Sequence, residues 1–197
     1  MTLVGFRRMH LAIHDKDGTV KPANKFIIEG KQDEGATVNA DITGLSAEPI
    51  KVYGSDIPYY VLQKGTGDAS VNFGILDMLV KVSDKILGYK QSEDGFALIG
   101  NSTEPPYVSI ILESEDLRGM KAYLGFFKGK FSQGDMNLKS KEGSNEAPNP
   151  DAYVFVPIAD SRDGETKGET AVKYIEETVS DPKATKFINL VFGLPEA

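Results

Sequence analysis

Hydrophobic and polar residues alternate along most of the chain, which is the pattern of β-strands with one buried face. In residues 3–13, Leu3, Met9, Leu11 and Ile13 fall on one face and Arg8, His10 and His14 on the other. The Asp17-Gly18 pair that follows is a strong turn signal. The same reasoning predicts further strands at 26–28, 37–42, 69–73, 107–113, 120–132, 152–158 and 170–178, and a short strand or turn at 135–138.

The predicted strand at 120–132 is apolar on both faces. Ala122, Leu124 and Phe126 alternate with Tyr123 and Phe127. A strand of this kind lies between two layers, or between a helix and a partner.

Two segments follow the helical period instead. In the first, apolar residues recur at intervals of three and four between an acidic cap and a closing glycine: Ile75, Leu79, Val82 and Ile86, with Asp77 and Gly88. The second begins at Asp181-Pro182 and ends before Gly193, and its apolar stripe is Ala184, Phe187, Ile188 and Val191.

Residues 44–67 have no clear period. They combine glycines and prolines with many aliphatic and aromatic side chains. We expect a long irregular loop that covers its own domain or packs on a neighbouring subunit, since such loops are often functional.

Runs of strands with hairpin signals predict an α+β, mainly β fold, an antiparallel β-sandwich or barrel with a flanking helix and a C-terminal helix. The 197 residues fit a single domain over 1–197. The start lacks the pattern of a signal peptide, and no apolar run is long enough to span a bilayer. We therefore expect a soluble protein, made in a cytoplasm and not associated with a membrane.

Composition removes several kinds of chemistry. The chain has no cysteine, which excludes disulfides, thiolate metal sites and a cysteine nucleophile. Its net charge of −7 opposes tight binding to nucleic acid, which requires Lys and Arg to displace counterions. In a passage through which DNA slides, the same charge would help.

Candidate ligand motifs also fail. His10 and His14 on a strand lie about 13 Å apart, too far to share one metal ion, and we expect both to face solvent or an interface. Asp15 begins a sequence like a calcium loop, but Val20 and Phe26 occupy the positions of its glycine and glutamate. Phosphate-binding and nucleophile-elbow motifs are missing, and the acidic pairs are those of any acidic protein. We predict no enzyme, with no catalytic, cofactor-binding or metal-binding residues.

Six segments together resemble the major tail proteins of siphophages that infect Gram-positive bacteria, and they run in the same order as in that family. They are VGFRR at 4–8, GATVNADITGL at 35–45, PYV and ESED within 106–116, FFKGKFS at 126–132, EAPNP at 146–150 and FINLVF at 187–192. Residues 50–70 match less well.

The resemblance implies the tail-tube fold, with two packed antiparallel sheets and a flanking helix. It further implies hexameric rings that stack into a tube around a tape-measure protein, together with other tail proteins. DNA would pass through the lumen without specific binding. The protein would be a structural part of the virion tail, assembled in the host cytoplasm and without a cofactor.

On this reading, candidate contacts between subunits or rings are Ile50, Val52, Tyr53, Ile57, Tyr59, Tyr60, Phe126 and Phe127. The two phenylalanines can equally be core residues, and the loop can fold back on its own domain. Alternative functions are a tail terminator, the tube protein of a phage-like bacteriocin, or a virion-associated carbohydrate-binding or hydrolytic domain.

Overall fold

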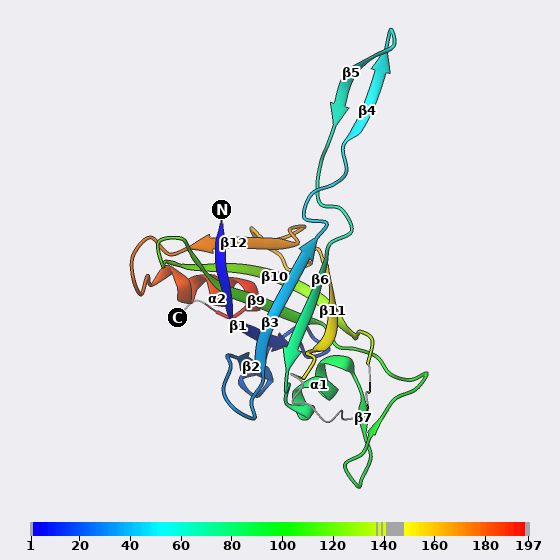
Figure 1. The fold of residues 1–197 in the computed structure, drawn as a ribbon, viewed down its shortest axis with the longest axis vertical. Helices are drawn as coiled ribbons and strands as arrows, with labels where there is room; N and C mark the ends of the chain where they lie inside the picture. The colour runs from blue at the N-terminus through cyan, green and yellow to red at the C-terminus, as the bar shows by residue number, and fades with distance from the viewer. Residues whose placement is uncertain (1, 137, 139, 141–147, 196–197) are drawn as a thin grey trace.

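A computed structural model describes residues 2–136, 138, 140 and 148–195. Within them an eight-stranded antiparallel sheet dominates, with the order β2-β1-β9-β10-β11-β6-β3 and β12 beside β10 (Figure 1). Its strands are β1 (Leu3–Ile13), β2 (Lys25–Ile28), β3 (Ala36–Thr43), β6 (Ser70–Leu76), β9 (Val108–Asp116), β10 (Lys121–Gln133), β11 (Asp151–Ile158) and β12 (Ala171–Ile175). Outside this sheet are the hairpins β4 (Ile50–Gly54) with β5 (Ile57–Leu62) and β7 (Lys90–Gln91) with β8 (Ala97–Leu98), the 3-10 turn η1 (Pro22–Asn24), and the helices α1 (Val80–Leu87) and α2 (Lys183–Phe192).

The long strand β10 belongs to both halves of the sheet. Its first half pairs with β9 and β12, and its second half pairs with β11. The register shifts between Phe126 and Gly129, which lets the strand bend. At the bend a glycine is required, because a Cβ at Gly129 would overlap the ring of Phe155.

The sheet folds back on itself, so that β3 at one end lies against β1 near the other end. The Thr37 hydroxyl of β3 donates a 2.9 Å hydrogen bond to the Phe6 carbonyl of β1. The rings of Phe6 and Phe73 lie 6.3 Å apart. The predicted mainly β class, with antiparallel sheets and a C-terminal helix, is confirmed.

The main core fills the space between the two layers. It contains the inward residues of every long strand, with α1 closing one end: Met9, Leu11, Val71, Phe73, Ile75, Val82, Ile86, Val108, Ile110, Leu112, Phe126, Phe131 and Phe155. Four of these are buried phenylalanines, which supply large apolar areas in a chain without tryptophan.

A second core lies on the outer face of the sheet, beneath α2. It joins Tyr123 and Phe127 of β10 to Phe187 and Val191 of the helix. Asp181 caps this helix, because its Oδ1 accepts a 2.9 Å hydrogen bond from the Lys183 amide. The predictions of a C-terminal helix and of a strand buried on both faces are confirmed.

The prediction for the first helix is wrong at its start. α1 begins at Val80, and Ile75 is a core residue of β6, paired with Thr37 and Asp151. Asp77 precedes the helix with a left-handed backbone (φ 51°) and does not cap it. Ile75 also continues the strand alternation of Val71 and Phe73, so two periods overlap at this residue. Gly88 closes the helix with φ 73°, as predicted.

The prediction that both histidines face solvent or an interface is wrong for His10. His10 is buried, with Nε2 at 3.3 Å from Oε2 of Glu113. His14 is half-buried, and its Nε2 lies 2.6 Å from the hydroxyl of Ser109. A short strand or turn was predicted at 135–138, but residues 135, 136 and 138 are in neither, and residue 137 lies outside the described part.

Candidate subunit interface

The segment at 44–67 forms a projecting hairpin, and the prediction of an irregular loop is wrong. β4 and β5 pair from Ile50 with Leu62 to Gly54 with Ile57, with one bulge after Val52. Ser55 and Asp56 form the two-residue turn, with φ values of 51° and 63° that match the primed turns of tight hairpins. Glycines and prolines in the segment hide the strand pattern. Figure 1 shows this hairpin extending away from the rest of the fold. We call residues 44–67 the arm and the rest of the described chain the body.

A glycine fixes the root of the arm. Gly44 has φ 71°, and a Cβ on it would overlap the backbone of Asp68, so another residue does not fit there. The Gly67 amide donates to the Gly44 carbonyl at 2.9 Å, and the Ala47 amide donates to the Gly65 carbonyl at 3.1 Å. These bonds hold the two legs together where they leave the sheet.

The arm is apolar on both faces and exposed along both strands. Six residues predicted as contacts lie on it, and their exposed fractions run from 48% for Val52 to 81% for Tyr59: Ile50, Val52, Tyr53, Ile57, Tyr59 and Tyr60. Val61 and Leu62 add to the same surface. Exposed apolar patches of this kind mark sites of protein association.

Phe126 and Phe127 do not belong to this surface. Their exposed fractions are 0% and 2%, and they lie in the main core and the second core of their own chain. The prediction that they contact another subunit is therefore wrong. The alternation of the sequence located the strand but did not show that α2 covers its outer face.

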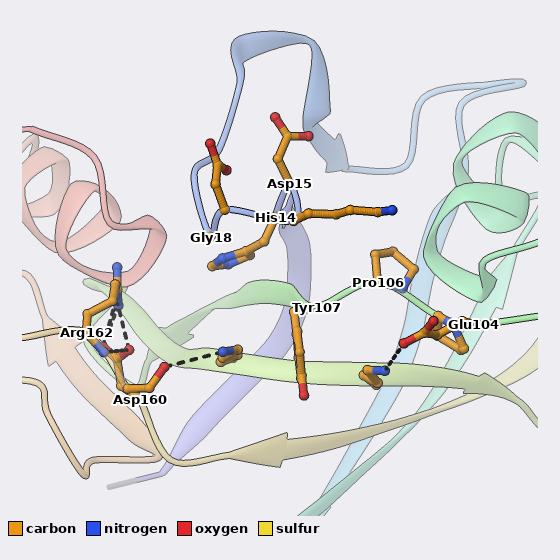
Figure 2. A pocket seen from close by; sticks show the side chains of 14 residues that line it. His14, Asp15, Gly18, Glu104, Pro106, Tyr107, Asp160 and Arg162 are labelled. Carbon is orange, nitrogen blue, oxygen red and sulfur yellow. Dashed lines mark hydrogen bonds and ion pairs between the residues drawn. The ribbon is translucent and has the colours of Figure 1, made fainter.

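A cleft of about 630 Å³ opens on the body, between the turn after β1 and the loop after β11. Figure 2 shows Tyr107 standing between the Asp160–Arg162 pair on one side and Glu104 on the other. Pro105 and Pro106 form an apolar wall beside it. Lys128 and Lys130 place their ammonium groups 4.3 and 4.9 Å from the centre of the Tyr107 ring.

The charges in the cleft are unevenly paired. Arg162 bonds Asp160 at 2.8 Å, and Lys130 lies 3.7 Å from Glu104. Lys128 donates to the Ser161 hydroxyl at 3.3 Å and forms no ion pair with any described residue. Burial lowers the pKa of His14, and the positive charges of Arg162 and Lys128 lower it further, so His14 is neutral near pH 7.

This cleft was not predicted from the sequence. Its residues come from four separate segments, and the sequence gives no spacing that relates Tyr107 to Lys128. The arm had a local signal, because four residues with high strand propensity, Ile57, Tyr59, Tyr60 and Val61, closely follow the Ser55-Asp56 turn.

Among residues 2–136, 138, 140 and 148–195, no three His, Asp or Glu side chains gather as a metal site. In the same part of the chain, no helix is long and apolar enough to cross a bilayer.

A folded antiparallel β-sheet that carries an exposed apolar arm is typical of a protein that associates with other proteins through that arm. The chain belongs to the phage tail tube protein family, whose model matches residues 1–194 of the 197. No curated protein matches the chain. Membership gives the protein a structural role in the tail tube of a phage virion, where it assembles with itself and with other tail proteins.

Proposed function

We propose that the protein forms hexameric rings that stack into a tube around a tape-measure protein, and that the tube later conducts DNA. The observation that carries this proposal is the arm, with apolar side chains exposed on both faces of β4 and β5. A hairpin exposed on both sides needs a partner that covers it, and a tube supplies neighbouring subunits at every position.

The geometry of the arm supports a polymer rather than a closed pair. The arm projects from the body, and its surface differs from that of the body. Where the arm contacts the body of the next subunit without a reciprocal insertion, the contact is heterologous, and its repetition gives a ring or a filament. A stack of rings contains both, because subunits close into a ring within one layer and the rings repeat along the tube axis.

The charge of the chain supports passage of DNA. A net charge of −7 repels phosphates, so a lumen lined by such subunits would not hold DNA by counterion release. That the phage infects a Gram-positive bacterium stays a prediction from the resemblance alone.

Electron microscopy of two variants tests the proposal. In the first, residues 50–62 are replaced by a short Gly-Ser turn, which removes the arm above its root. In the matched control, the small β7–β8 hairpin is shortened in the same way, which removes exposed Phe96 and Leu98.

Wild-type protein at high concentration is expected to form rings or tubes with a central hole. The control is expected to assemble and the armless variant to remain unassembled, with both bodies folded by circular dichroism. Tubes of normal length from the armless protein would contradict the role of the arm. Assembly of the wild type that always stops at one ring would instead favour a tail terminator.

A further inference from the structure

The cleft around Tyr107 contains a positive charge without a counterion. Lys128 lies over an aromatic ring and beside a hydroxyl. Of the other cations that line the cleft, Lys130 and Arg162 each have a carboxylate partner, whereas Lys16, like Lys128, forms no ion pair with a described residue. Such an ammonium group, half-buried against Tyr107 and the proline wall, favours an anion that is attached to an apolar group.

The tip of the arm has the complementary chemistry. Asp56 is the only charged residue between positions 52 and 62. It lies at the turn, flanked by exposed Tyr53, Ile57 and Tyr59. Among the described side chains, Asp56 has no hydrogen-bond or ion-pair partner. The tip therefore presents one carboxylate surrounded by apolar surface.

The dimensions also agree. A volume of about 630 Å³ is in the range of pockets that enclose compact ligands, and a two-residue turn with one aromatic side chain is such a ligand. The arm leaves the body in one direction, so the tip that enters a cleft belongs to another copy (Figure 1).

We propose that the Tyr107 cleft receives the arm tip of a second copy of this chain, with the Asp56 carboxylate on the Lys128 ammonium and a tip aromatic side chain against Tyr107 and Pro106. The inference rests on the proposed tube assembly and names the two surfaces that meet in it.

Charge reversal tests the ion pair. Asp56→Lys and Lys128→Glu are each expected to raise the protein concentration needed for assembly about tenfold, because each places like charges in contact. The double variant restores the opposite charges and is expected to assemble near the wild-type concentration. Lys173→Glu is the matched control, since this exposed strand lysine lies outside the cleft.

Wild-type assembly by Lys128→Glu would overturn the proposal. So would a double variant that assembles no better than the single variants while all of them show the wild-type circular dichroism spectrum.

Disulfide trapping tests the contact without changing either charge. The chain has no cysteine, so Ser55→Cys with Ser161→Cys adds the only two thiols, one beside Asp56 and one beside Lys128. Oxidation of concentrated protein is expected to give a ladder of linked chains on a non-reducing gel. The matched pair is Ser55→Cys with Ser132→Cys, whose second thiol lies on an exposed part of β10 outside the cleft and is expected to give no ladder.

The two proposals fail in different ways. Tubes without a Ser55–Ser161 ladder would overturn the cleft contact and leave the tube standing, with another tail protein as a possible occupant of the cleft. A ladder without rings or tubes would support the contact and overturn the stacked-ring assembly. Neither ladder nor tubes would overturn both.

Discussion

At the scale of single residues, the packing of α2 against the sheet requires a glycine at one position of β10. Gly125 lies on β10 beneath α2, where an added Cβ would be 2.5 Å from Cγ2 of Val191 and 3.3 Å from the ring of Phe187. We expect Gly125→Ala to destabilise the fold by about 1–3 kcal/mol, because the second core has no room for a methyl group. Urea unfolding measures the change.

Gly100→Ala is the control for that substitution, because nothing lies within 4 Å of the added carbon. Equal urea midpoints for the two variants would show that α2 shifts to accommodate the methyl group at no cost.

Glu113 makes the stability of the fold sensitive to acid. Burial opposes its charge, but the hydrogen bond from His10 and the charge of Arg8 outweigh burial and lower the pKa of Glu113 below its ordinary value of 4.5. The unfolded chain therefore binds the proton first. The stability that Glu113 contributes is complete above pH 4.5 and is lost as the pH falls through the folded-state pKa.

We expect Glu113→Gln to cost about 3 kcal/mol at neutral pH, since it removes the buried carboxylate that faces both Arg8 and His10 and leaves Arg8 with half-buried Glu29 alone. Its melting temperature should also fall less steeply than that of the wild type below pH 4.5. Thermal unfolding across that range measures both effects. Parallel curves for the two proteins would mean that Glu113 does not carry the acid sensitivity.

At the scale of elements, α2 stabilises the fold through its aromatic contacts. The ring of Phe187 lies 5.7 Å from the ring of Tyr123 and 6.0 Å from that of Tyr174. We predict that Phe187→Ala costs about 3–5 kcal/mol, as expected for a buried aromatic residue. Phe96→Ala, at an exposed hairpin residue, should change stability by less than about 0.5 kcal/mol. Denaturant unfolding compares the two, and similar costs would contradict the buried role of α2.

Elements with one dominant period could be predicted from the sequence. β10 alternates over its first half, so both its existence and its two buried faces follow from the residues. α2 has a cap, a proline and a closing glycine in the correct order. The start of α1 was not predictable in this way, because Ile75 satisfies the strand and the helix pattern at once.

The candidate interface was predictable only in part. The apolar content of residues 50–62 located the arm, but sequence cannot distinguish a strand buried by its own chain from one that awaits a partner. For the same reason the sequence pattern predicted the same role for Phe126 and Tyr59, although Phe126 is fully buried and Tyr59 is 81% exposed. The cleft depends on contacts between segments far apart in the chain, which local patterns do not encode.

At the scale of the whole molecule, acidic residues outnumber basic ones. With 29 acidic and 22 basic residues, the protein offers phosphates little net attraction. We expect the purified protein to leave the electrophoretic mobility of duplex DNA unchanged at physiological ionic strength. A retarded band that persists at that ionic strength would contradict the proposed free passage of DNA.

The isolated arm has a consequence for the timing of assembly. A two-stranded hairpin without a covering layer is only marginally stable in water, so we expect β4 and β5 to open often in a free subunit. In the proposed assembly, docking on a neighbouring subunit covers the arm. Part of the binding free energy of that contact is then used to order the two strands. Association of two free subunits through a single arm contact is therefore weak. We expect the tube to grow where a subunit can form several contacts at once. In a hydrogen-exchange experiment, we therefore expect the arm amides to exchange quickly in the free subunit and to become protected in the proposed polymer.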